Sequence, residues 1–117
     1  MMQFKSDSLL KSSEQEWEEV GAGIKRKITG YNDDAMMILV QFEKGGIGEQ
    51  HSHVHTQSTY IESGSFEVTI SGSTQLLQQG DCFFVPPNAI HGVVCVSSGV
   101  LVDVFSPIRE DFLINNL

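Results

Sequence analysis

The chain has 117 residues, 40% of them hydrophobic and 19% charged, which is enough apolar material for the core of one globular domain. Its formal net charge of −8 argues against a nucleic-acid partner and against anionic membrane surfaces, because both require basic contacts. No apolar run approaches the length of a membrane span. An anionic small molecule is compatible with this charge, since a metal ion or one arginine in a pocket can reverse the local field.

The expected elements, taken in chain order, are those of an all-β protein. Residues 14–19 predict a short acidic turn of helix, and short segments rich in Val, Ile, Phe and Thr follow. The expected strands are residues 24–29, 36–43, 50–55, 59–63, 65–70, 74–78, 82–85, 92–97 and 100–105. Short strands without intervening helices predict a sandwich or a closed barrel in one domain, with Pro86-Pro87 ending a strand at its rim.

The N-terminal residues and the cysteines indicate the compartment. Residues 1–13 are polar and lack the apolar segment of a signal peptide. Cys82 and Cys95 lie in strand-like runs and have no CxxC spacing. This pattern predicts two buried thiols in a reducing cytoplasm, and it leaves open a disulfide between neighbouring strands.

The histidines indicate the chemistry. Three of the four fall in the stretch 51–55, and the fourth is His91. Residues two apart on a strand point to the same face, so His51 and His53 can present two imidazoles to one point inside a barrel. Together with Gln57 and His91 they can enclose a divalent ion and leave positions open for a small molecule.

Each of these residues also has an ordinary explanation. A single histidine is usually structural or solvated, and His55 fits that description if it points to the pocket wall instead of the ion. Gln57 alone would be an ordinary polar residue. The spacing of the whole set favours the metal site.

That spacing resembles the two motifs of the cupin family. The first motif is matched by Gly45, five residues, His51-x-His53, three residues, Gln57, six residues and Gly64, with Gln in place of the usual Glu. The second is matched by Gly80, five residues, Pro86-x-Asn88, two residues and His91, with Asn88 for the usual Gly and Cys95 where Asn is often found. The resemblance implies that residues 1–117 form a single cupin domain, an all-β double-stranded β-helix or jelly-roll barrel.

Further features resemble the KdgF-type cupins of pectin and alginate breakdown. They are Gln57 itself, Pro86-Pro87-Asn88 before His91-Gly92, Trp17-Glu18, Arg26-Lys27-Ile28, Met36-Met37 and the residues 103–112. The resemblance covers about residues 17–113 and leaves residues 1–16 as an N-terminal extension. Members of that family open the ring of 4,5-unsaturated monouronates to the linear 5-keto-4-deoxyuronate. Thr56 stands where that family has an acidic residue, which weakens an outer contact and leaves all four ligand positions intact.

The ring-opening chemistry suits the predicted metal site. Loss of the C1 hydroxyl proton lets the ring oxygen leave as an enolate conjugated with the carboxylate, and protonation at C4 gives the ketone. A divalent cation stabilises the developing oxyanion more than the ground state. Since the step has no redox change, Zn²⁺ or Ni²⁺ is the favoured ion, with Mn or Fe as further candidates. The neutral Gln57 keeps the ion a stronger Lewis acid than a Glu would.

The proton-transfer and substrate-binding groups are expected on the last strand and beyond it. Asp103 shares a strand face with Leu101 and Phe105, and an acid on an apolar face is costly to bury without a purpose or a partner. The resemblance implies that Asp103 is the catalytic acid/base, that Phe105 lines the pocket and that Arg109 acts near the anionic end of the substrate. A structural Asp103–Arg109 ion pair at the barrel mouth is the alternative.

Other predictions concern the pocket wall, the assembly and the class of function. His55 and Tyr60 are candidates for substrate binding, although Tyr60 can equally pack. Strands with apolar residues on both faces, such as 36–40 and 100–104, predict a second buried surface and therefore a homodimer. The resemblance implies that the partner is a small anionic sugar, an unsaturated uronate. The alternatives are another metal-dependent cupin enzyme, an isomerase or dioxygenase, or a sugar-binding cupin without turnover.

Overall fold

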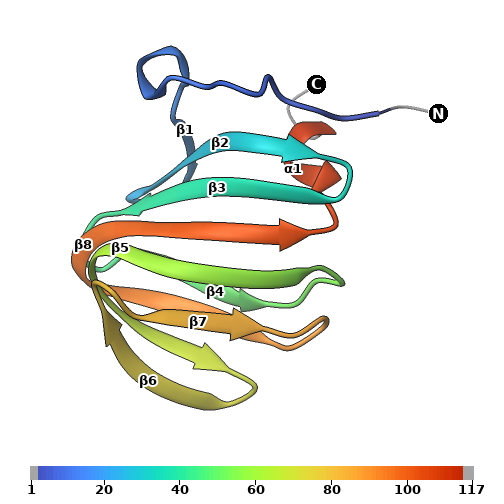
Figure 1. Cartoon of the computed structure of the whole chain (residues 1–117). Helices are drawn as coiled ribbons and strands as arrows, with labels where there is room; N and C mark the ends of the chain where they lie inside the picture. Colours follow the sequence, from blue (N-terminus) through green and yellow to red (C-terminus); the bar gives the residue numbers. More distant parts are fainter. Residues whose placement is uncertain (1–2, 115–117) are drawn as a thin grey trace.

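The computed structural model describes residues 3–114, which form one antiparallel barrel (Figure 1). A 3₁₀ turn, η1 (Ser12–Glu14), precedes the strands, and a short helix, α1 (Glu110–Ile114), follows them. The strands are β1 (Glu18–Gly21), β2 (Ile24–Asn32), β3 (Ala35–Phe42), β4 (Ile47–His51), β5 (Thr56–Ile70), β6 (Ser73–Gln78), β7 (Cys82–Val85) and β8 (His91–Ser106). The all-β prediction is therefore confirmed. No helix within residues 3–114 is long and apolar enough to cross a membrane.

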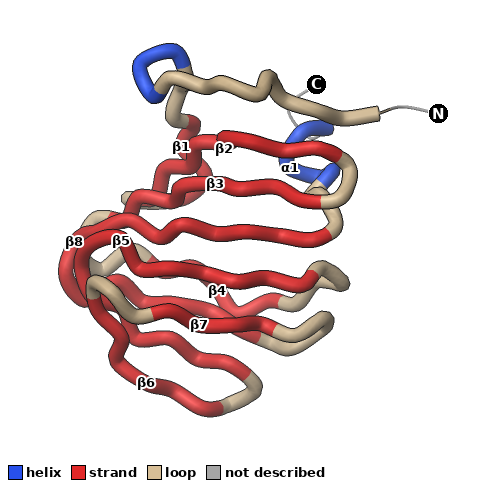
Figure 2. Tube along the Cα trace, in the orientation of Figure 1, coloured by secondary structure: helices blue, strands red, loops and turns tan. Residues whose placement is uncertain are grey.

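The strands belong to one sheet that curls back on itself (Figure 2). Its order is β1-β2-β3-β8-β5-β6, with β4 paired to β8 and β7 paired to β5. Strands β5 and β8 pair along nearly their whole length, from Thr56 opposite Ser106 to Ile70 opposite His91. The first half of β8 also pairs with β4 and its second half with β3. One strand thus contributes side chains to both halves of the barrel.

Two glycines explain why β5 and β8 were each predicted as two shorter strands. The sequence suggested breaks at Gly64 and at Gly99, but both strands run through these positions with shifts in register. Gly64 has a φ of +81°, and a Cβ there would lie 2.5 Å from the carbonyl oxygen of Ser97. A Cβ on Gly99 would collide with the backbone of Ser63. These glycines mark a bend where two long strands cross closely, not the end of a strand.

Three local predictions need correction. The helical turn expected over residues 14–19 is only the 3₁₀ turn at Ser12–Glu14, and Glu18 already begins β1. Strand β4 ends at His51, so His53 lies in the loop before β5 and does not share a strand face with His51. Cys95 is buried as expected, but Cys82 is exposed, and both are free thiols.

The barrel interior holds two groups of buried apolar side chains. The larger group lies where β5, β7 and β8 meet and includes Phe66, Val85 and Leu101. The smaller group includes Phe105 and Ile108 and lies beside α1. Residues 3–16 run along the outer edge of β2, where the Ser6 amide donates to the carbonyl of Tyr31 at 2.9 Å (Figure 1).

Candidate metal centre and cavity

Three histidines converge at one rim of the barrel. His51 ends β4 and pairs directly with His91, which begins β8. The loop after β4 brings the ring of His53 to 5.6 Å from that of His51 and 4.8 Å from that of His91, measured between ring centroids. One ligand atom from each of the three lies within 4.8 Å of the others. The three histidines could therefore form a metal site.

Backbone carbonyls fix the proton on the same nitrogen of all three rings. The Nδ1 atoms of His51, His53 and His91 donate to the carbonyl oxygens of Glu49 at 2.8 Å, His55 at 3.1 Å and Ala89 at 2.9 Å. A carbonyl can only accept, so each Nδ1 carries the proton and each Nε2 presents a lone pair. Burial also lowers the pKa of His53 and His91, which favours the neutral imidazoles that bind metals.

Gln57, at the start of β5, faces the three histidines and could supply a fourth donor. Its Nε2 donates to Thr59 Oγ1 at 3.0 Å and to Asp103 Oδ1 at 3.5 Å, so its Oε1 faces His53 Nε2 at 2.9 Å. Both facing atoms present lone pairs, and such a pair is stable when a cation lies between them. Two ligands of one ion, each about 2.0–2.2 Å from it, lie roughly 3 Å apart. The residues present therefore fit a divalent metal ion.

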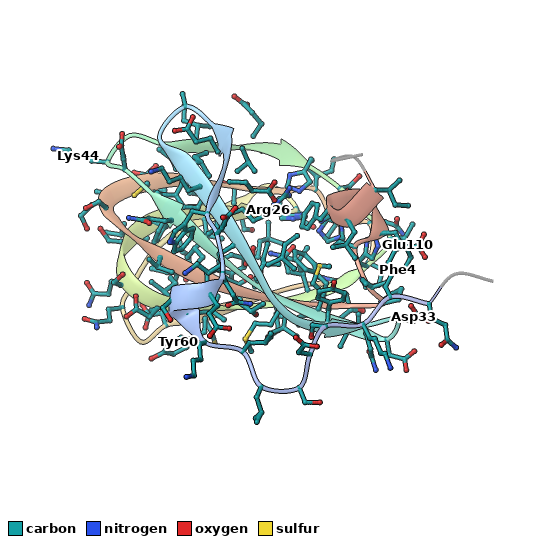
Figure 3. All side chains as sticks on the ribbon, turned by 90° about the horizontal axis from the view of Figure 1, so that it is seen from above. Phe4, Arg26, Asp33, Lys44, Tyr60 and Glu110 are labelled. Carbon is teal, nitrogen blue, oxygen red and sulfur yellow. The ribbon has the colours of Figure 1, made fainter. Side chains whose placement is uncertain are left out.

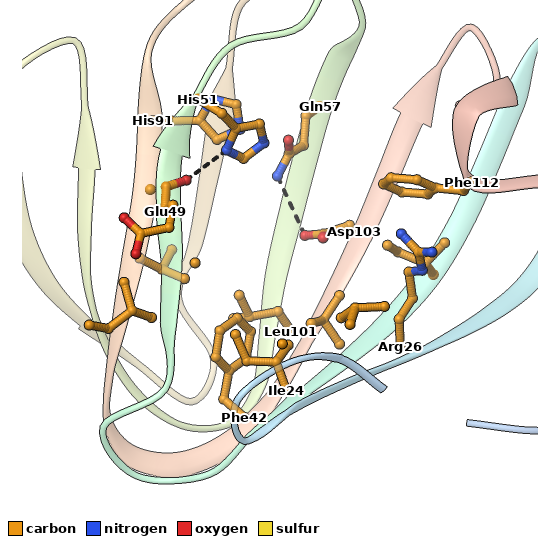
Figure 4. A pocket seen from close by; sticks show the side chains of 18 of the residues that line it. Ile24, Arg26, Phe42, Glu49, His51, Gln57, His91, Leu101, Asp103 and Phe112 are labelled. Atoms are coloured by element: carbon orange, nitrogen blue, oxygen red, sulfur yellow. Dashed lines mark hydrogen bonds between the residues drawn. The ribbon is translucent and has the colours of Figure 1, made fainter. Parts of the chain in front are cut away.

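Asp103 lines the cavity into which Gln57 and the histidines point, and it lies between them and the opposite wall (Figure 4). Its side chain comes from the second half of β8, is 8% exposed and accepts a hydrogen bond of 2.6 Å from Thr59 Oγ1. Burial raises the pKa of Asp103 to about 6, although the Thr59 hydroxyl and the charge of Arg109 oppose the rise. A carboxyl group in this environment can both accept and return a proton near neutral pH.

Arg109 does not pair with Asp103, which corrects the alternative of a structural ion pair between them. Its Nε and Nη2 donate to Asp111 Oδ1 at 3.1 Å and to Oδ2 at 2.9 Å. Burial acts to raise the pKa of Asp111, but the hydrogen bonds and charge of Arg109 hold it below its ordinary value. The guanidinium carbon of Arg109 also lies 4.1 Å from the ring centroid of Phe112.

The three other predicted site residues, Phe105, His55 and Tyr60, differ in their position relative to the cavity. Phe105 is buried, lines the cavity and meets the His53 ring edge-on at 5.7 Å between centroids. The ring of His55 lies 5.4 Å from that of His53 but outside the group of three ligand atoms. Tyr60 is 50% exposed and follows the fully buried Thr59, so it points to the outside of the barrel (Figure 3). The expectation that Tyr60 binds substrate is therefore not supported by its position.

The cavity has a volume of about 740 Å³ and three chemically distinct parts. His51, His91 and Gln57 line one end of the cavity, and together with the adjacent His53 we call it the histidine end (Figure 4). Apolar residues, among them Ile24, Phe42 and Leu101, form the floor. The wall opposite the histidines carries a cationic group that we call the guanidinium end, made of Arg26, Arg109 and Phe112.

Sequence reasoning missed Arg26 and Thr59 as site residues. Arg26 stands two residues after Ile24 and two before Ile28, so it shares their strand face as Asp103 shares that of Leu101. The criterion that singled out Asp103, a charge on an apolar face, applies to Arg26 as well. Thr59 had no comparable signal, because an isolated threonine in a strand is common.

Comparisons with known proteins find related sequences and related solved structures. The pattern of the Cupin domain family matches residues 38–105. The pectin degradation protein KdgF of Dickeya dadantii (strain 3937) is 51% identical over 102 residues, which cover 86% of this chain and 93% of that protein.

Two solved structures are also similar over almost the whole chain. An RmlC-like cupin from Shewanella frigidimarina NCIMB 400 has a TM-score of 0.90 and 42% identity, covering 92% of this chain and 97% of its own. KdgF from Halomonas sp. has a TM-score of 0.87 and 36% identity, covering 92% of this chain and 99% of its own. This chain therefore belongs to the cupin superfamily and, within it, to the KdgF-type cupins.

Proposed function

We propose that this protein opens the ring of 4,5-unsaturated monouronates from pectin or alginate and yields the linear 5-keto-4-deoxyuronate. The similarity to a pectin degradation protein supports the substrate class. The observation that carries the proposal is the position of Asp103, a buried carboxyl group held by Thr59 between the histidine end and the guanidinium end of one cavity.

The roles of the side chains follow from their positions. Asp103 accepts the proton of the C1 hydroxyl, the bond between C1 and the ring oxygen breaks, and C1 becomes an aldehyde. Asp103 then returns the proton to C4, so the reaction is an isomerisation that needs no oxidant or reductant. Arg109 lies near the anionic end of the sugar, with its side chain held in place by Asp111. Phe105 closes the wall beside them.

His51, His53, Gln57 and His91 would hold the metal ion. A bound Zn²⁺ or Ni²⁺, or else Mn²⁺ or Fe²⁺, supplies Lewis-acid stabilisation of the oxygen on which negative charge develops. Gln57 is neutral and is itself oriented by Thr59 and Asp103, so the ligand and the acid/base share one hydrogen-bonded chain.

The test follows the absorbance of the conjugated enoate in an unsaturated galacturonate prepared with a polysaccharide lyase. We expect the wild type to accelerate its loss over buffer and Asp103→Asn to abolish that gain. Asp34→Asn, an exposed acid in the turn between β2 and β3, is the matched control and should behave as the wild type. Equal decay with wild type and buffer would rule out ring opening and favour a non-catalytic sugar-binding cupin. Iron in the purified protein, together with no accelerated loss of the enoate, would favour an oxygenase.

We also propose a cytoplasmic homodimer. The outer face of the sheet exposes Met37 on β3, Val104 on β8 and Phe84 on β7, and Met37 and Val104 are direct cross-strand neighbours. Apolar side chains gathered on one outer face favour burial against a second copy. Light scattering should give twice the mass of the chain, and Phe84→Lys should shift it towards the monomer. A wild type that is monomeric at micromolar concentration would contradict this assembly.

A further inference from the structure

Arg26 is a further charged side chain in the cavity. It comes from an early strand and lies far in sequence from the candidate metal ligands. It comes from β2, its side chain is 16% exposed, and it lines the cavity wall opposite His51 and His91 (Figure 4). The preceding residue, Lys25, is exposed. The strand therefore directs one cation into the cavity and its neighbour to solvent.

Two contacts hold the Arg26 side chain in place. Its Nε donates to Glu18 Oε1 at 2.9 Å, across the β1–β2 pair. Its guanidinium carbon lies 4.0 Å from the ring centroid of Phe112, a cation–π contact that Arg109 also makes with this ring. Among residues 3–114, Glu18 is the hydrogen-bond partner of this side chain, so the Nη1 and Nη2 groups keep their donors for a ligand in the cavity.

The two arginines differ in what they can still bind. Arg109 gives its Nε and Nη2 to the carboxylate of Asp111. Arg26 gives only its Nε, which leaves the Nη1–Nη2 edge free to bind a carboxylate through two parallel hydrogen bonds. In a chain of net charge −8, such a group also provides a local positive field for an anionic ligand.

We propose that Arg26 is a second substrate-binding arginine that binds the carboxylate of the uronate and makes the cavity selective for acidic over neutral sugars. For the identity of the substrate this inference rests on the function proposed above. In this arrangement the sugar lies between the guanidinium end and the histidine end, with Asp103 beside it.

The first test is kinetic. Arg26→Gln should raise KM by roughly 10- to 100-fold, the loss expected for charge-assisted hydrogen bonds, and should change kcat by only a few-fold, because Arg26 takes no part in proton transfer. Arg26→Lys should restore part of the loss, and Lys25→Gln, which removes the same charge outside the cavity, should match the wild type. An unchanged KM in Arg26→Gln, or an equal rise in Lys25→Gln, would overturn the proposal.

A second variant separates substrate binding from a structural role. Glu18→Gln removes the ion pair but keeps the guanidinium in the cavity. If Arg26 binds the carboxylate, Glu18→Gln should raise KM far less than Arg26→Gln. If Arg26 serves only to tie β1 to β2, the two variants should have the same effect. Circular dichroism and metal content show whether each variant is folded and loaded.

Calorimetric titration with D-galacturonate and D-galactose tests recognition without turnover. We expect the wild type to bind the uronate roughly tenfold or more tightly than the neutral sugar, and Arg26→Gln to lose that preference. A wild type without preference, or a preference that Arg26→Gln keeps, would refute the inference. If the wild type opens no unsaturated uronate but shows the Arg26-dependent preference, the proposed reaction fails while this inference holds.

Discussion

The histidine end and the guanidinium end of the cavity are built in different ways. At the histidine end, His51, His53 and Gln57 lie within seven residues, and His91 joins them through direct pairing of β4 with β8. At the guanidinium end, Arg26 comes from β2, Arg109 from the segment after β8, and Phe112 from α1. Local spacing governs the first end, whereas packing between distant elements governs the second. Substitutions should therefore separate metal binding from substrate binding.

The largest expected effect is the loss of a ligand at the histidine end. His91→Ala should lower bound metal and reduce activity by more than about 100-fold, because the remaining donors no longer enclose the ion. Elemental analysis and turnover measure the two effects. His55→Ala is the matched control, since its ring lies beside His53 but outside the three-histidine group, and it should keep its metal. Retained metal in His91→Ala would exclude this site.

A substitution at the bend in β5 should lower the stability of the whole barrel, and therefore affect both ends of the cavity. Gly64→Ala places a methyl group against the carbonyl oxygen of Ser97 at a φ of +81°, so we expect about 3 kcal/mol less stability in chemical denaturation. Gly72→Ala has a similar φ of +85° with nothing within 4 Å of the new Cβ, and should cost about 1 kcal/mol. Equal losses in the two variants would contradict close crossing at Gly64.

The connection between the ends can be tested at Thr59. Thr59→Val keeps the shape of the side chain but removes the hydroxyl that joins Gln57 to Asp103. We expect kcat to fall about tenfold with metal content unchanged, because a hydrogen bond to a charged group is lost. Thr59→Ser, which retains the hydroxyl, should recover most of the activity. A loss of metal instead would mean that Thr59 mainly positions Gln57.

The smallest effect is expected at the Arg109–Asp111 pair. The pKa of Asp111 is lowered in the folded state, so the pair stabilises the fold above the ordinary pKa of an aspartate and this contribution is lost as pH falls through the folded value. Asp111 is partly exposed, so the effect on stability is at most about 1 kcal/mol. Asp111→Asn should lower Tm at pH 7 and lower it by less at pH 3, because pH 3 lies below the ordinary pKa of an aspartate. Glu110→Gln, which changes the exposed neighbour, is the control and should keep the Tm of the wild type. If Asp111→Asn lowers Tm equally at both pH values, the pair does not provide this stability.

Much of the fold and of the histidine end could be predicted from the sequence. The strand pattern, the turn glycines and the spacing of His51, His53 and Gln57 are local features, so they specify strands and a ligand group without reference to distant contacts. The reasoning for His53 was nevertheless wrong in detail, since a loop and not a strand presents it. The bends in β5 and β8 could not be predicted, because a glycine in a strand pattern is also typical of a turn.

The sequence by itself determined the type of fold, the composition of the histidine end and the presence of an acid on an inward strand face. Only the tertiary structure decided the partner of each charge. It pairs Arg109 with Asp111, holds Asp103 through Thr59, places Arg26 in the cavity and turns Tyr60 away from it. The physical reason is that spacing along a strand determines which face a side chain takes. The partner it meets depends on how the curled sheet and α1 bring distant residues together.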